Sequence, residues 1–106
     1  MRGTMYILEC ADGSFYVGST TSLAHRLEQH NAGVGARYTQ SRRPVKVVFE
    51  TEFDSIAEAF AFEKQVQGWS RAKRKALIDG RFHELPKLSR NHQTEVVSTG
   101  STTGID

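Results

Sequence analysis

Two short apolar segments near the start of the chain, joined by a tight turn, constrain the fold more than any other feature. Residues 5–10 (MYILEC) and 14–18 (SFYVG) are rich in the aromatic and branched side chains that strands prefer. The three residues between them, 11–13 (ADG), carry the Asp-Gly pair that is typical of hairpin turns. The two segments therefore predict a β-hairpin.

The register of this hairpin decides which side chains share a face. A two-residue loop would place Tyr6 and Tyr16 on opposite faces, because a shift of one residue reverses every side chain. A three-residue loop instead pairs Cys10 with Ser14, gives Gly13 a left-handed conformation and puts both tyrosines on one face. We favour the three-residue loop because the other face is then uniformly apolar, with Met5, Ile7, Phe15 and Val17. On this pattern alone, the tyrosines are equally consistent with ordinary strand aromatics.

Periodicity and capping residues predict the remaining elements. In order, these are a helix over LAHRLEQHN after the cap candidates Thr20, Thr21 and Ser22, a turn of helix around Ala36–Thr39, a strand over Val45–Thr51, a helix from Ser55 to about Trp69, and a helix from Ser70 to Ile78. The resulting fold class is α/β (α+β), in the order β-β-α-β-α-α, with a small three-stranded antiparallel sheet flanked by helices. We expect one domain over residues 1–90. The polar, aperiodic stretch 91–106 is expected to be a disordered tail.

Composition excludes several classes of protein. The apolar runs are too short to cross a membrane, and a single cysteine, Cys10, excludes an internal disulfide, so the cytoplasm is the expected location. A net charge of +2 is too small to argue for nucleic acid by itself. The basic residues nevertheless fall into two groups, which are either solvated faces or a phosphate-binding surface: Arg37, Arg42 and Arg43, and the RAKRK segment with Arg71, Lys73 and Lys75.

One carboxylate lies where a core residue is expected. In the helix from Ser55, Glu63 falls at the centre of an apolar stripe that contains Ile56, Ala59, Phe60 and Val66. A carboxylate there is costly unless a cation or hydrogen-bond donors meet it. Glu63 is therefore either paired with an arginine at the rim of the core or the ligand of one hard cation that keeps most of its waters.

Two further candidates lie on the first helix. Arg26 and His30 are four residues apart and so share a face, about 60° from the buried leucines Leu23 and Leu27 and at the edge of the core. An arginine in that position suits a phosphate oxygen, although an exposed pair with no role has the same spacing.

The hairpin carries a family resemblance. Met5-Tyr6-Ile7 followed by Tyr16-Val17-Gly18 resembles the signature of the GIY-YIG nucleases, with Met5 in place of the first glycine. Arg26 and Glu63 match that family's arginine and metal-binding glutamate, and His30 matches a histidine seen in part of it. The segments ADGSFYVGSTTSLAHRLEQHNAG, ARYTQSRRPV and EKQVQGWSRAKRKALI are similar to its stand-alone, single-domain bacterial group of uncharacterised proteins. The resemblance spans about residues 4–80.

The resemblance implies metal-dependent endonuclease-like hydrolysis of phosphodiester bonds. Glu63 would hold one divalent cation, Mg²⁺ or Mn²⁺. Tyr6 would take a proton from the attacking water and pass it on through His30, and Arg26 would stabilise the developing charge. Nucleic acid is the implied partner, DNA rather than RNA, read by structure more than by sequence and in a context such as DNA repair.

Further roles follow from the same resemblance. Tyr16 would orient water or phosphate through its hydroxyl, and Gly18 would let the substrate backbone approach closely. The two basic groups would hold the strand through its phosphates.

Two departures from the family pattern favour a rival reading. Ser19 stands where many members have a lysine, and no asparagine lies about a dozen residues beyond Glu63. The first rival is therefore a nucleic-acid-binding module that has lost cutting. The second is a protein-interaction domain whose hot spots are aromatic residues such as Phe53 and Trp69.

Overall fold

The computed structural model describes residues 1–88, which form one sheet with helices on both of its faces. The three strands are β1 (Gly3–Glu9), β2 (Phe15–Thr20) and β3 (Lys46–Phe53), and both strand pairs are antiparallel, in the spatial order β2-β1-β3. The predicted three-stranded antiparallel α+β fold is thus confirmed. The predicted domain end at residue 90 and the predicted tail, 91–106, lie outside the described residues.

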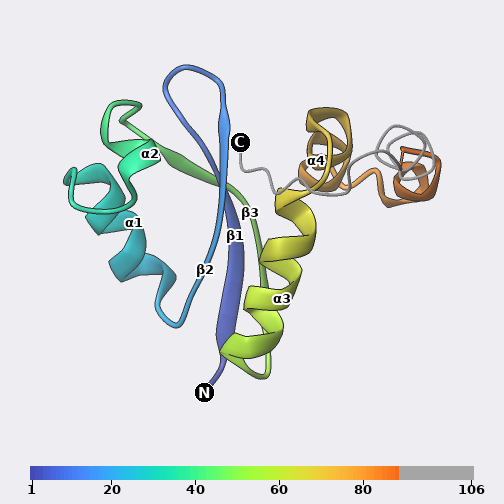
Figure 1. Cartoon of the computed structure of the whole chain (residues 1–106), viewed down its shortest axis with the longest axis horizontal. Helices are drawn as coiled ribbons and strands as arrows, with labels where there is room; N and C mark the ends of the chain where they lie inside the picture. Colours follow the sequence, from blue (N-terminus) through green and yellow to red (C-terminus); the bar gives the residue numbers. More distant parts are fainter. Residues whose placement is uncertain (89–106) are drawn as a thin grey trace.

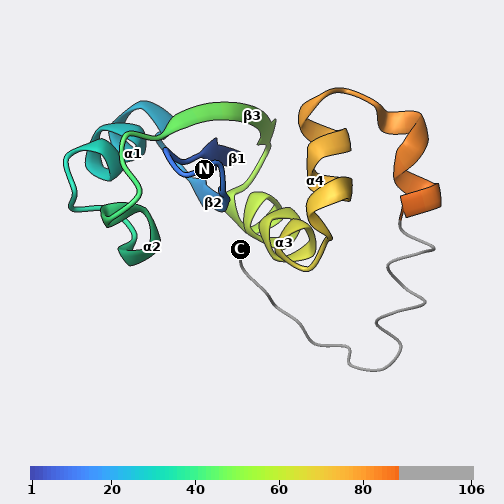
Figure 2. The same ribbon diagram turned by 90° about the horizontal axis from the view of Figure 1, so that it is seen from above.

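The helices divide into two groups by the face of the sheet that they cover. They are α1 (Leu23–Asn31), α2 (Arg37–Gln40), α3 (Ile56–Gln67), α4 (Arg71–Ile78) and the 3₁₀ turn η1 (Phe82–Glu84). Figure 1 shows α1 and α2 on one side of the sheet and α3 and α4 on the other. Figure 2, seen from above, shows the same division. None of these helices within residues 1–88 has the length and apolar character needed to span a bilayer.

The hairpin adopts the three-residue loop. Cys10 and Ser14 pair through a backbone hydrogen bond of 2.8 Å, and Gly13 has a φ of 86°. Tyr6 lies opposite Gly18, and the partner of Tyr16 on β1 is Leu8. Both tyrosines therefore lie on the face of the sheet that α1 and α2 cover.

Two hydrophobic clusters form, one on each face. The cluster under α3 and α4 contains Met5, Ile7, Phe15, Val17, Ala59, Val66 and Leu77. The cluster under α1 and α2 contains Tyr6, Leu8, Cys10 and Val45, with Tyr16, Leu23, Leu27, Tyr38 and Val47 packed against it. The tyrosines are thus held by apolar neighbours at their rings, which fixes where their hydroxyls point.

The structure corrects two expectations about aromatic residues. Phe53 and Trp69 both pack against the cluster under α3, where Phe62 contacts them with ring centroids 5.8 Å and 6.1 Å away. They are part of the core and not exposed hot spots. The periodicity predicts Phe60 on the buried stripe of α3, yet this side chain is 50% exposed, because the helix turns Ala59, Glu63 and Val66 toward the sheet instead.

The capping predictions explain how α3 and α4 begin. The Ser55 hydroxyl accepts a hydrogen bond from the Glu58 amide at 3.1 Å, and the Ser70 hydroxyl accepts one from the Lys73 amide at 3.1 Å. These caps fix the start of α3 and therefore the rotation that brings Glu63 to the edge of β2.

Candidate active site

A chain of hydrogen bonds runs from Tyr6 into the space between α1 and α2. The Tyr6 hydroxyl lies 3.1 Å from Nε2 of His30, and Nδ1 of His30 lies 2.8 Å from the hydroxyl of Thr39. The Thr39 hydroxyl in turn donates to the carbonyl oxygen of Ala36 at 2.9 Å. His30 is fully buried by this chain, whereas the sequence placed it at the edge of the core.

Counting protons along this chain fixes its direction. A threonine hydroxyl has one proton, and here that proton goes to Ala36, so Thr39 must accept from Nδ1–H of His30. Burial, and to a lesser extent the charge of Arg26, lower the pKa of His30 and keep it neutral. A neutral imidazole with a proton on Nδ1 has none on Nε2. Tyr6 therefore donates its hydroxyl proton to His30, and its oxygen lone pairs remain available.

The second tyrosine belongs to a ring stack. Tyr16 contacts Tyr6 and His30, with ring centroids 6.5 Å and 5.2 Å away. Its other neighbour is Tyr38 of α2, stacked at 6.2 Å and 25°. The guanidinium of Arg42 lies 3.9 Å above the Tyr38 ring. The ring of Tyr16 is thus held between Tyr6 of β1 and Tyr38 of α2, which limits how far its hydroxyl can move.

Gly18 makes room for Tyr6. A β-carbon at position 18 would lie 2.6 Å from the Tyr6 hydroxyl and 2.7 Å from the ring carbon that carries it. The space that the sequence assigned to an approaching substrate backbone is therefore filled by the phenol. This corrects the reason for the glycine, which is packing against Tyr6.

We expect Gly18→Ala to displace Tyr6 and destabilise the fold. The ring of Tyr6 is buried, so it cannot swing away, and overpacking of this kind costs about 1–3 kcal/mol. Chemical denaturation measures the loss. A neutral effect on the free energy of unfolding would show that the backbone of β2 moves instead. The matched control is Gly68→Ala, where the added β-carbon would make only an ordinary contact, 3.6 Å from the Gln65 carbonyl oxygen.

The carboxylate of Glu63 reaches the β2 edge of the sheet from α3, which covers the face opposite to the two tyrosines. Glu63 accepts hydrogen bonds from the Ser19 hydroxyl at 2.5 Å and from the Gln67 side-chain amide at 2.8 Å. The same amide of Gln67 donates to the carbonyl oxygen of Val17 at 3.2 Å, which ties α3 to the free edge of β2. Lys64 lies 4.0 Å from Glu63 and is largely exposed. Glu63 is thus buried, meets neutral donors, and has no arginine partner among residues 1–88.

Electrostatics link Glu63 and Arg26 to both phenols. Burial raises the pKa of Tyr6 far above its usual value, and Tyr16 and Glu63 raise it further, whereas Arg26 lowers it. Burial and Glu63 likewise raise the pKa of Tyr16, and Arg26 opposes them. Within the described residues the side chain of Arg26 has no ion-pair or hydrogen-bond partner, so its guanidinium remains available beside the phenols.

The donor set suits one hard cation with a largely aqueous shell. Glu63 is one carboxylate whose two oxygens each accept a single hydrogen bond, so each keeps a lone pair. No group of three or more His, Cys, Asp or Glu side chains that could hold a metal occurs in residues 1–88, which does not match a zinc site with several protein ligands. Mg²⁺ and Mn²⁺ commonly bind through one or two carboxylates plus water and phosphate oxygens.

The predicted basic residues do not gather around Glu63. Arg42 binds Asp12 at 3.1 Å and Arg71 binds the carbonyl oxygen of Gly13 at 3.0 Å, so both lie at the hairpin turn. Arg37 is exposed on α2, and Lys75 is exposed on α4 and pairs with Asp79 at 3.5 Å.

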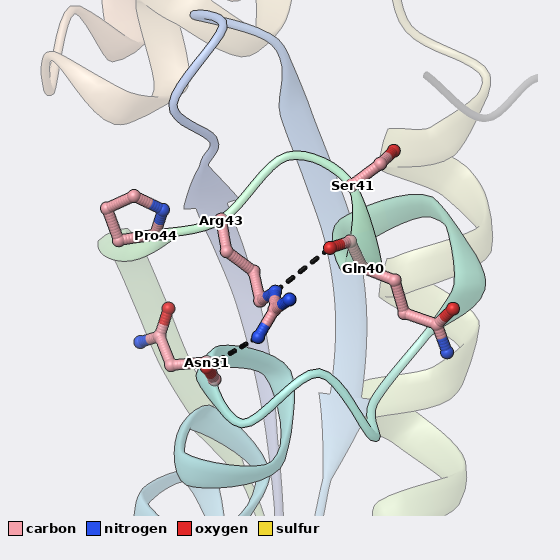
Figure 3. Close-up of a pocket in the computed structure, with 5 residues that line it drawn as sticks. All are labelled: Asn31, Gln40, Ser41, Arg43 and Pro44. Carbon is pink, nitrogen blue, oxygen red and sulfur yellow. Dashed lines mark hydrogen bonds between the residues drawn. The ribbon is translucent and has the colours of Figure 1, made fainter.

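Two of these residues serve the fold. Lys73 is only 7% exposed and its ammonium lies 3.8 Å above the Trp69 ring, which removes it from the phosphate-binding set. Figure 3 shows Arg43 reaching toward Asn31 and Gln40, whose carbonyl oxygens accept from it at 3.3 Å and 2.9 Å. The surface pocket at this place contains neither tyrosine and is separate from the Glu63 site.

Sequence reasoning missed three residues that position the others. Thr39 orients His30, Tyr38 stacks on Tyr16, and Gln67 orients Glu63. Gln67 could have been found, since it lies four residues after Glu63 on the same side of the helix. Tyr38 and Thr39 meet the hairpin only through tertiary packing, for which the local pattern holds no signal.

The fold and the sequence of this domain both match a family of known proteins. A family model described as the GIY-YIG catalytic domain matches residues 2–76. The chain belongs to the GIY-YIG family.

This chain matches several relatives over nearly their whole length. The UPF0213 protein VNG_2274C of Halobacterium salinarum is 44% identical over 74 residues, which cover 70% of this chain and 96% of that protein. The UPF0213 protein BH0048 of Halalkalibacterium halodurans is 40% identical over 92 residues, which cover 84% of this chain and 98% of that protein. The solution NMR structure of protein EF2693 from E. faecalis matches with a TM-score of 0.54 and 34% identity, over 78% of this chain and 88% of that one.

Proposed function

We propose that this protein hydrolyses phosphodiester bonds in nucleic acid with the help of one divalent cation, Mg²⁺ or Mn²⁺, held at Glu63. The observation that carries the proposal is the electrostatic coupling of four groups, because the charges of Arg26 and Glu63 both act on the phenols of Tyr6 and Tyr16. These groups come from β1, β2, α1 and α3, and packing alone gives no reason for a buried carboxylate among them.

The hydrogen-bond chain supports a path for the proton of the attacking water. That proton moves to the Tyr6 oxygen while the proton of Tyr6 moves to Nε2 of His30, so no free phenolate has to exist beforehand. This matters because the pKa of Tyr6 is raised, and a phenolate would be scarce at neutral pH. The lowered pKa of His30 favours return of the proton once the product has left.

The remaining groups act on the phosphate. Arg26 donates to a non-bridging oxygen and offsets the charge that develops as the water oxygen bonds to phosphorus and the leaving oxygen departs. The Tyr16 hydroxyl, fixed by its ring stack, orients the phosphate or the water. A bound cation would supply Lewis-acid stabilisation of the same charge.

The substrate is proposed to be DNA rather than RNA, recognised by structure more than by sequence, as in DNA repair. Arg37, Arg71 and Lys75 are exposed and are the members of the two basic groups that remain candidates for phosphate contacts. With so few of them, we expect weak binding and a shallow salt dependence.

One observation favours a second candidate, a nucleic-acid-binding module without cleavage. Both oxygens of Glu63 already accept hydrogen bonds, from Ser19 and Gln67, so the carboxylate is satisfied without a cation. Such a module would bind nucleic acid through the same surface and leave it intact.

A cleavage assay separates the two candidates. End-labelled nicked, flapped and fully paired DNA are incubated with the purified protein, with Mn²⁺, with Mg²⁺ or with a chelator. The proposal expects products that depend on the cation and carry the same ends at every site. Binding to these substrates without products under any cation would establish the second candidate.

Thr39 offers a test of the proton path. In Thr39→Val the Nδ1–H of His30 loses its acceptor, so the tautomer with the proton on Nε2 becomes populated. In that tautomer Nε2 cannot accept the proton of Tyr6. We expect turnover to fall about tenfold with little change in KM. The ¹⁵N chemical shifts of the His30 ring report the tautomer directly.

The pH profile supplies the control. Since the path needs neutral His30, activity should fall as pH drops through the folded pKa of His30, which lies below 6.5. Thr39→Ser keeps the hydroxyl and should restore both turnover and tautomer. Equal activity in Thr39→Val and wild type would remove His30 from the path.

A further inference from the structure

An exposed phenylalanine lies next to the carboxylate of the candidate site. Phe60 precedes Glu63 by three residues on α3, so the two occupy neighbouring positions on one side of the helix. Phe60 is 50% exposed, and no aromatic ring within residues 1–88 contacts it. A large apolar side chain in water beside a buried carboxylate has no role in the core of this fold.

A lysine connects this ring to the site. The ammonium of Lys64 lies 4.9 Å from the Phe60 ring centre and 4.0 Å from a carboxylate oxygen of Glu63. The same ammonium lies 3.4 Å from the side-chain oxygen of Gln67, the residue that orients Glu63. One cation therefore contacts both the apolar ring and the carboxylate, and these residues form a continuous strip along the side of α3.

The strip matches the chemistry of one nucleotide. An aromatic ring with an open face binds a base by stacking, and an adjacent ammonium binds the phosphate. A base inside a duplex is already stacked on both sides, so only an unpaired base can use such a ring. Resting on the proposed hydrolysis at Glu63, we propose that Phe60 and Lys64 hold one unpaired nucleotide beside the scissile phosphate.

This assigns a substrate class to the site. Cleavage next to a single-stranded nucleotide, as at a flap or an overhang, is favoured over cleavage within continuous duplex. A protein partner would use Phe60 in a different way, since it needs a broad apolar surface, and the residues that follow Phe60 on this side of α3 are Glu63, Lys64 and Gln67, which are charged or polar.

The test compares two phenylalanines of similar exposure. Phe82 is 57% exposed and lies on η1, beyond α4, so Phe82→Ala is the matched control for Phe60→Ala. Binding is measured by fluorescence anisotropy without divalent cation, using a labelled duplex with a short single-stranded overhang and a blunt duplex of the same length. Because binding is measured without cleavage, failure of the proposed hydrolysis does not decide this experiment.

We expect Phe60→Ala to weaken binding to the overhang substrate about tenfold and to leave binding to the blunt duplex unchanged. Phe82→Ala should bind both as wild type does. Lys64→Ala should also weaken binding to the overhang, but that loss should shrink at high salt, whereas the loss in Phe60→Ala should persist. Both phenylalanine variants should melt at the wild-type temperature.

Three binding results would overturn the proposal. They are unchanged binding to the overhang in Phe60→Ala, an equal loss on the two substrates, or an equal loss in Phe82→Ala. A preference for overhang cleavage that survives in Phe60→Ala would likewise show that another part of the chain selects the substrate, while leaving the hydrolysis itself in place.

Discussion

Glu63→Gln should abolish cation-dependent cleavage while leaving the protein folded, with a melting temperature equal to or above that of the wild type. The amide keeps the size of the side chain but lacks the charge that holds a cation, and loss of metal-ion catalysis costs several kcal/mol of transition-state stabilisation, on the order of a thousandfold in rate. Burial of a carboxylate whose hydrogen-bond donors are neutral disfavours folding, so loss of its charge should keep or raise the melting temperature. The measurements are single-turnover cleavage in Mn²⁺ and thermal unfolding.

A matched substitution shows whether position matters. Glu58→Gln changes the same chemical group on the opposite, exposed side of α3 and should retain full activity. If Glu63→Gln cleaved DNA at the wild-type rate, Glu63 would have only a structural role, and the hydrogen bonds from Ser19 and Gln67 would be sufficient to explain its burial.

Tyr6→Phe should reduce turnover by about two to four orders of magnitude, because it removes the atom proposed to take the proton of water. Binding should change little, since the ring that packs under α1 stays in place. Nε2 of His30 would lose its donor, which costs about 1 kcal/mol and leaves the fold intact. The turnover rate and the substrate affinity are measured separately, so that an effect on KM is not mistaken for an effect on catalysis.

Tyr38→Phe is the control for this substitution. Tyr38 belongs to the same ring stack, and its stacking on Tyr16 does not need the hydroxyl. The Tyr38→Phe variant should therefore lose little activity. A similar loss in the two variants would mean that the packing of the rings, and not the Tyr6 hydroxyl, limits the rate.

The local pattern was sufficient for the elements and the hairpin register. The Asp-Gly turn allowed two registers, and only the three-residue loop separated an apolar face from a face with tyrosines, so burial selected the observed one. The serine caps located the starts of α3 and α4 because capping is a contact between residues three apart.

The local sequence pattern did not predict the side-chain contacts between separate helices and strands. The 100° rotation per residue placed Glu63 correctly but also put Phe60 on the buried stripe, because the sheet covers less of α3 than the periodicity suggested. The basic run predicts that Lys73 binds phosphate, yet its ammonium lies over the Trp69 ring. The partners of His30 come from α2, whose position no local signal determines.

The central claim is that one cation position is shared by the carboxylate and the two phenols. NMR of isotope-labelled protein titrated with Mn²⁺ tests it, since the paramagnetic ion broadens the signals of nearby atoms. We predict selective broadening of the Glu63 side chain together with the rings of Tyr6 and Tyr16, and loss of that broadening in Glu63→Gln. Broadening that leaves both rings sharp and centres on other carboxylates, such as Asp79 and Glu84 near Arg81, would contradict the account.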